Sequence, residues 1–226
     1  MRLPAHPPEI STEGDHRYIA AIDADAGGTW LAANDHGLVV GILNYYQYQV
    51  PDTRGNQTFI SRGKLVTSLM ACKSPSDAAQ QLDQAAAENY RAFILLLFGV
   101  DQAVLQLKWN GTTLERSELP LSGDPISTSS FRTEDVLARR QQAFENIVRS
   151  SATPDDTAYR AFHEHRETDS DAYSVCMSRD DARTVSFSQV SVRTDEIAYA
   201  YYAEGPAQTS APATCTLPRV ESSTHS

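Results

Sequence analysis

The chain has 226 residues, of which 19 are Lys or Arg and 29 are Asp or Glu, so its formal net charge is −10, and 41% of its residues are hydrophobic. This composition is typical of a folded globular protein, and the length suffices for one large domain or two small ones with a real core. The acidic balance argues against nucleic-acid binding, because no cationic excess exists to displace counterions from phosphates, and no apolar run reaches the ~20 residues of a membrane helix.

The chain begins with a proline-rich segment and continues with short strands. Three prolines within the first eight residues exclude a regular helix and remove sheet donors, so residues 1–16 are predicted to be an exposed, extended lead-in. The next β-favouring runs predict strands at 18–22, 29–33 and 38–43. The turn at 34–37 should join the last two as a hairpin.

Helical spacing dominates two later regions. One predicted helix begins at Ser61 or Arg62, and a second is expected to be capped by Ser76 and to run through Ala87. A long helix is predicted over 133–149 and a helical turn over 157–163. Asn110-Gly111 lies between two alternating runs, which is a strong hairpin signal.

The remaining runs predict strands at 91–98, 102–109, 112–117, 175–177, 184–192 and 196–203. Strands and helices come in separate blocks, which indicates an α+β fold of mostly antiparallel sheet. Residues 17–204 are predicted to form one domain. Residues 205–226, rich in Ala, Pro, Ser and Thr, are predicted to be a disordered tail.

Several polar residues are weak candidates for chemistry. His163 and His165 suggest either a metal site or a solvated charged turn, and the turn is favoured because i, i+2 histidines diverge on a helix. Asp23 and Asp25 suggest either paired carboxylates or an ordinary turn, and Cys176 suggests either a nucleophile or a buried small side chain. The second interpretation is preferred in each case, and no metal site is predicted.

Asn44 is more informative, because it ends a buried strand. A carboxamide there can aim its NH₂ group at an oxyanion, or it can cap the following turn. Arg62 and Arg183 are candidates for binding a substrate carboxylate. Phosphate-loop and dinucleotide motifs are missing from the sequence, so no cofactor is expected. Three widely spaced cysteines without a secretory signal predict free thiols and a cytoplasmic location.

Several segments together resemble the NRDE family, the relatives of the transport and Golgi organisation proteins. Asp25-Ala26-Gly27-Gly28-Thr29-Trp30-Leu31 with the following Asn34-Asp35-His36-Gly37-Leu38 resembles the family's GGTW block, Ile42-Leu43-Asn44 its strand-ending Asn, and Ser61-Arg62-Gly63 its helix start. Residues 129–144 and the two segments 175–177 and 181–186 resemble later parts of bacterial members. The resemblance covers roughly residues 2–202.

The resemblance implies a four-layer αββα sandwich similar to N-terminal-nucleophile hydrolases. In that mechanism a cysteine after the initiator methionine attacks an amide, and its own α-amino group is the base. The implied activity is hydrolysis of C–N bonds other than peptide bonds. Asn44 would be an oxyanion donor, and Trp30, Asn44, Arg62 and Arg183 would bind substrate. Animal members are associated with Golgi organisation and with lipid or haem handling.

The sequence departs from the family at residue 2, which is Arg2 instead of cysteine, and the Asn-Arg-Asp-Glu motif is absent. We therefore expect the chain to be N-terminally truncated relative to the family, either by a misassigned start or by true loss, and to be inactive as it stands. The alternative function is non-enzymatic binding or trafficking of a small lipid-like or haem-like molecule, with residues 44–48 as an aromatic rim. Neither function calls for nucleic acid or a membrane span.

Overall fold

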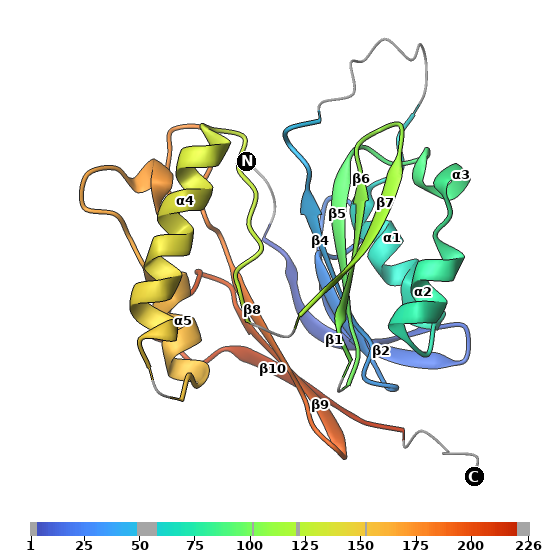
Figure 1. Cartoon of the computed structure of the whole chain (residues 1–226). Coiled ribbons are helices and arrows are strands. Elements are labelled where there is room, and N and C mark those ends of the chain that lie inside the picture. Colours follow the sequence, from blue (N-terminus) through green and yellow to red (C-terminus); the bar gives the residue numbers. More distant parts are fainter. Residues whose placement is uncertain (1–3, 49–57, 101, 121–122, 152, 221–226) are drawn as a thin grey trace. The chain divides into compact units, whose positions relative to one another are not determined.

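A computed structural model describes residues 4–48, 58–100, 102–120, 123–151 and 153–220 (Figure 1). The chain forms two compact units. The first comprises Met1–Leu121, Ser188–Tyr201 and Ala213–Ser226, and the second comprises Ser122–Phe187 and Tyr202–Pro212. The segment predicted to be one domain therefore contributes to both units.

The first unit is built on a seven-stranded sheet whose strands follow one another in chain order, each antiparallel to the next. The strands are β1 (His6–Glu13), β2 (His16–Ile22), β3 (Leu31–Asn34), β4 (Val39–Asn44), β5 (Phe93–Phe98), β6 (Val104–Trp109) and β7 (Leu114–Leu119). The predicted hairpins are confirmed. At the β6–β7 turn, the Asn110 side chain accepts hydrogen bonds from the backbone N–H groups of Thr112 and Thr113, and Gly111 has φ 96°, which favours glycine.

Short helices cover one face of this sheet (Figure 1). They are α1 (Arg62–Ser68), the 3₁₀ turn η1 (Leu69–Ala71), α2 (Pro75–Gln81) and α3 (Gln84–Ala87). The helix start at Arg62 is confirmed. The helix predicted from Ser76 to Ala87 is wrong in detail, because Ser74 caps α2 and Leu82 is extended before Asp83 caps α3. Pro75 fits at the first helical position, where no N–H bond is lost.

A three-stranded antiparallel sheet, ordered β10-β9-β8, packs on the other face. Its strands are β8 (Phe187–Val192), β9 (Glu196–Tyr202) and β10 (Ala213–Pro218). Ile19 and Ala21 of β2 bury against Tyr199, Tyr201 and Leu217. The first unit thus contains a helical layer and two sheets, and the predicted α+β class with mostly antiparallel sheets is confirmed.

The second unit holds α4 (Thr133–Phe144), which continues as the π-helical turn η2 (Glu145–Arg149), then α5 (Asp156–Glu164) and η3 (Asp171–Tyr173). Its core consists of Ala143, Phe144, Val148 and Phe162. The strand predicted at 175–177 is wrong. The Cys176 N–H binds the His165 carbonyl, and Thr184 N–H binds the Met177 carbonyl, so this segment is held as a loop.

The segments near the two ends of the chain, predicted as an extended lead-in and a disordered tail, both contain a β-strand. Residues 6–13 form the edge strand β1, where prolines are tolerated because one side has no ladder partner among the described strands. The register of β1 against β2 shifts between His6 and Glu9. The prediction of a disordered tail is wrong for β10, which pairs with β9 along its whole length and buries Leu217. Composition misses β10 because its stability comes from the partner strand.

None of the helices among the described residues has the length and apolar character needed to cross a bilayer.

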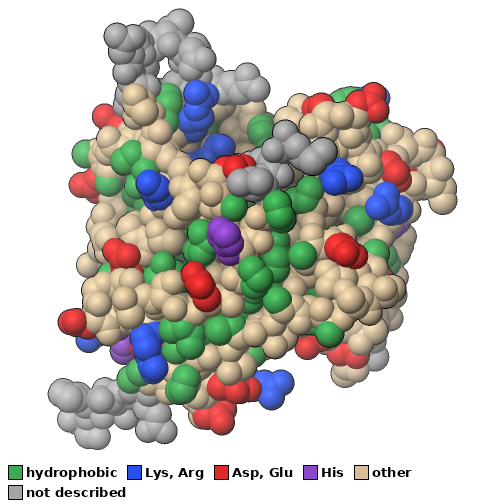
Figure 2. Space-filling view, turned by 180° about the vertical axis from the view of Figure 1, so that it is seen from behind, with side chains coloured by type: hydrophobic (Ala, Val, Ile, Leu, Met, Phe, Trp, Pro, Cys, Tyr) green, Lys and Arg blue, Asp and Glu red, His purple; other side chains and the backbone are tan. Residues whose placement is uncertain are grey.

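On the face drawn in Figure 2, acidic side chains lie interspersed with the basic ones.

Candidate functional site

The candidate site begins with a close contact between two glycine-containing motifs. Thr29 N–H donates to the Gly63 carbonyl at 3.2 Å, and a Cβ on Gly63 would lie 2.8 Å from the Thr29 nitrogen. Thr29 is buried and its hydroxyl donates to the Ala21 carbonyl at 2.7 Å. The two backbones can approach only because neither Gly28 nor Gly63 has a side chain. This contact fixes the position of the first turn of α1, where Arg62 lies.

Asn44 and Arg62 lie at one end of the seven-stranded sheet, on its helix-covered side. Val40 of β4 belongs to the core on that side and Ile42 packs against it, and Asn44 follows with the same two-residue period. The Arg62 Nη1 donates to the Ala92 carbonyl at 2.9 Å, and Tyr45 N–H donates to the same carbonyl at 3.2 Å. The structure therefore brings these two predicted residues together.

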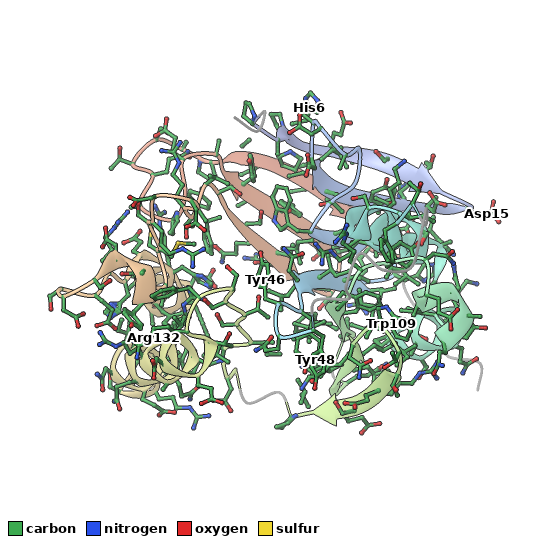
Figure 3. All side chains as sticks on the ribbon, turned by 90° about the horizontal axis from the view of Figure 1, so that it is seen from above. His6, Asp15, Tyr46, Tyr48, Trp109 and Arg132 are labelled. Carbon is green, nitrogen blue, oxygen red and sulfur yellow. The ribbon has the colours of Figure 1, made fainter. Side chains whose placement is uncertain are left out.

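Tyr46 lies near both side chains. The Asn44 Nδ2 donates to the Tyr46 hydroxyl at 2.7 Å, and Tyr46 lies close enough to Arg62 to be among the groups that influence the pKa of its guanidinium. Tyr46 is 40% exposed and Tyr48 is 47% exposed, and both lie on the loop after β4 (Figure 3). The carboxamide of Asn44 is thus held by an exposed hydroxyl that a ligand can replace.

Arg62 is a half-buried cation. Burial lowers the pKa of its guanidinium, and the neighbouring Arg91 lowers it further. A guanidinium stays charged at neutral pH in spite of such shifts. Among the described residues, no carboxylate lies within ion-pair distance of Arg62. Arg91 and the Ala92 carbonyl were not predicted from the sequence, where their position immediately before β5 was the only available signal.

Trp30 and Arg183 lie elsewhere. The Trp30 ring belongs to the cluster between the two sheets, with its centroid 6.1 Å from that of Tyr201, so it does not join Asn44 and Arg62 on the helix-covered side. Arg183 is exposed in the second unit, where its backbone forms an isolated bridge with Ser178.

The other polar candidates from the sequence, Asp23, Cys176, His163 and His165, lie in ordinary turn or packing contacts. Asp23 Oδ1 accepts from the N–H groups of Asp25 and Ala26, as expected for a turn. Cys176 is buried, as the preferred interpretation holds. His163 packs its ring against Phe162 and Phe187, and His165 lies 3.7 Å from Glu167. Within the described part of the chain, these two histidines do not join a group of three ligand-type side chains.

Comparisons with known proteins agree with this architecture. Penicillin V acylase from Agrobacterium tumefaciens, an N-terminal-nucleophile hydrolase, superposes with a TM-score of 0.50 and 11% sequence identity over 95% of this chain and 76% of that chain. At this identity the likeness shows the fold alone. A search of curated proteins finds no sequence match. The family model described as Transport and Golgi organisation 2 (TANGO2) matches residues 3–205, and the chain therefore belongs to that family, as the resemblance to NRDE proteins predicts.

Proposed function

We propose that this protein binds a small molecule carrying an amide and an anionic group, at the end of β4, as part of a C–N hydrolase site of the N-terminal-nucleophile type. The observation that carries the proposal is the Asn44 carboxamide, whose Nδ2 donates to the exposed Tyr46 hydroxyl at 2.7 Å, and to no other group among the described residues, beside the Arg62 guanidinium. A carboxamide N–H can donate to a developing oxyanion. Arg62 would bind the anionic group.

The 226-residue polypeptide itself is expected not to hydrolyse the amide. All of its cysteines are internal, at positions 72, 176 and 215, and burial raises the pKa of the Cys72 thiol, which disfavours the reactive thiolate. Cys176 is buried in a loop. Binding and hydrolysis are therefore separate measurements on this chain.

The test is a binding and turnover assay with N-acyl amino acids and penicillin V as probe amides. We expect 1:1 binding, about tenfold weaker in Asn44→Ala and Arg62→Gln, because each loses one hydrogen bond or charge contact to the ligand. Asn89→Ala and Arg193→Gln remove exposed side chains of the same types and should bind like the parent. Equal affinities in all five proteins would refute the assignment of Asn44 and Arg62, and release of free amine by the 226-residue chain would refute the nucleophile argument.

A second candidate function is non-enzymatic carriage of an apolar, lipid-like or haem-like molecule. The exposed tyrosines Tyr46 and Tyr48 and the 44% exposed Ile60 favour it. Native mass spectrometry of protein purified from its own host distinguishes the two: a retained apolar ligand, lost in a Tyr46→Ser and Tyr48→Ser double variant, supports carriage. Retention of the same ligand by the double variant would exclude this rim.

We also propose that the protein acts in the cytoplasm. Cys72, Cys176 and Cys215 are free thiols, which suits a reducing compartment. Fractionation of host cells followed by thiol labelling would show reduced cysteines in the cytosolic fraction, and recovery in a secreted fraction would contradict the proposal.

A further inference from the structure

Two turns of the seven-stranded sheet place a group of metal-ligand side chains together. His16 begins β2 after the β1–β2 turn, and Asp35 and His36 lie in the β3–β4 turn. Among the described residues, these three side chains form one group in which the ligand atoms all lie within 4.8 Å of one another. The two histidine rings meet edge to face, with their centroids 4.6 Å apart.

Asp35 is buried and its backbone is fixed on both sides. It is 4% exposed, its N–H donates to the Arg17 carbonyl at 2.9 Å, and its own carbonyl accepts from Val220 N–H at 2.7 Å. The carboxylate oxygen Oδ2 accepts from Arg17 N–H at 3.1 Å. This rigid attachment determines where the other carboxylate oxygen points.

The second oxygen, Oδ1, is buried and has no hydrogen-bond partner among the described residues. It lies 3.7 Å from His16 Nδ1, too far for a hydrogen bond and within the group of ligand atoms. A buried carboxylate oxygen without a partner is costly. A cation between Asp35 and the two histidines would satisfy it.

We propose that His16, Asp35 and His36 bind a divalent transition-metal ion, with Zn²⁺ as the best fit. Two imidazoles and one carboxylate are a common ligand set for Zn²⁺, and the fourth position would be filled by water. Donor atoms around tetrahedral Zn²⁺ are about 3.4 Å apart, so the ligands must close by roughly an ångström, which rotation of the two half-buried histidine rings can supply.

The position of this site in the sheet favours a structural role for the ion. Asn44 ends β4, whereas His36 precedes its first residue, so the proposed metal site and the proposed substrate site lie at opposite ends of one strand. The ion would tie the β1–β2 turn to the β3–β4 turn. Arg17 and Lys73 are the cations beside these ligands, and they will moderate the affinity for a dication.

The experiment uses the full chain, stripped with a chelator and titrated with Zn²⁺ by calorimetry, with the bound metal counted by elemental analysis. We expect one Zn²⁺ per chain, a Zn²⁺-dependent rise in the unfolding temperature, and visible d–d bands when Co²⁺ replaces Zn²⁺. His16→Gln and His36→Gln should each weaken binding by roughly tenfold or more, since even loss of an outer-shell partner costs about 10–100-fold. His6→Gln and His163→Gln, which alter exposed histidines, should bind like the parent.

A second measurement on the unaltered protein covers the case in which a ligand variant does not fold. Zn²⁺ should protect His16 and His36, but not His163, from acylation by diethyl pyrocarbonate, as read by mass spectrometry. Absence of stoichiometric binding would overturn the proposal, and the three side chains would then contain only an ion pair between His16 and Asp35. Binding that persists unchanged in both ligand variants, or equal protection of all three histidines, would also overturn it.

Discussion

Asn34 shows how one buried polar side chain joins two layers. It is fully buried, and its Nδ2 donates to the carbonyls of Met70 and Cys72 at 3.0 and 2.7 Å. Its Oδ1 accepts from the N–H groups of His36 and Leu38 at 3.2 and 3.1 Å. The side chain therefore shapes the β3–β4 turn and also holds the end of η1 against the sheet.

Removing this side chain should be costly. We expect Asn34→Ala to lower the free energy of unfolding by about 3 kcal/mol or more, because four backbone groups lose a partner in a dry environment. Asn34→Asp, which would set a carboxylate against two carbonyls, should be no better. Asn89→Ala is the control, because Asn89 is exposed, and should cost less than about 1 kcal/mol. Urea denaturation measures all three, and a loss for Asn34→Ala equal to that of the control would contradict this role.

Tyr199 is expected to make the free energy of unfolding vary with pH in the alkaline range. It is fully buried, and burial raises the pKa of its hydroxyl to about 12. The folded state therefore retains a proton that the unfolded state releases above its ordinary pKa of about 10. The resulting stability is present below pH ~10 and is lost as the pH rises towards ~12.

We expect the parent protein to lose about 2–3 kcal/mol more stability than Tyr199→Phe between about pH 8.5 and pH 12. Comparing the change with pH, and not the absolute stability, removes the cost of the lost hydroxyl contact with the Leu31 carbonyl. Tyr48→Phe, at an exposed tyrosine, should follow the parent curve. Parallel curves for the parent and Tyr199→Phe, measured by urea unfolding, would show that Tyr199 does not control this dependence.

At the scale of elements, the position of α1 depends on a backbone contact. Gly63 in its first turn meets the segment before β3, where Thr29 N–H donates to the Gly63 carbonyl. A Cβ on Gly63 would lie 2.8 Å from the backbone nitrogen of Thr29 and 3.0 Å from the carbonyl oxygen of Thr29. Backbone atoms cannot give way as a flexible side chain can, so α1 would have to shift and Arg62 would shift with it.

Gly63→Ala is therefore expected to cost about 1–3 kcal/mol or more in stability and to weaken ligand binding at Asn44 and Arg62. Gly41→Ala is the matched control in β4, because a Cβ there would meet its nearest atom, Leu31 Cδ1, at an ordinary 3.6 Å. Thermal unfolding of both variants measures the difference. The same melting temperature for both would mean that the contact between the two motifs is not tight in solution.

At the scale of the whole molecule, distant segments complete the second sheet. β10 pairs with β9 from Ala213↔Tyr201 to Pro218↔Glu196, and Leu217 is fully buried against Ile19 and Tyr199. After β10, Val220 N–H donates to the Asp35 carbonyl at 2.7 Å. Residues 213–220 thus contribute to the core of the first unit and contact one proposed metal ligand.

Leu217→Ala should lower the free energy of unfolding by about 2–5 kcal/mol, as for other buried leucines replaced by alanine. Val220→Ala removes a side chain that is 43% exposed and should change stability by less than about 0.5 kcal/mol. Chemical denaturation of the two variants tests whether β10 is held in the sheet. A loss at Leu217 no larger than that at Val220 would restore the mobile tail that the composition predicts.

The sequence alone determined the features that depend on neighbouring residues. The β6–β7 hairpin follows from Asn110-Gly111, the start of α1 from helical spacing after Arg62, and the family from the glycine-containing motifs at 27–30 and 61–63. It also indicated Asn44 and Arg62, which the structure places near each other, as candidate site residues. These features are local because turn chemistry and helical periodicity act over a few residues.

Only the tertiary structure decided which distant segments meet. It gave β10 its partner and β1 its edge position. It separated Trp30 from Asn44, and it joined His16 to Asp35 and His36 across two turns. Such contacts depend on burial and strand pairing between segments far apart in the sequence. Short-range patterns carry no information about these partners, since a segment of low apolar content folds only when a neighbouring sheet covers it.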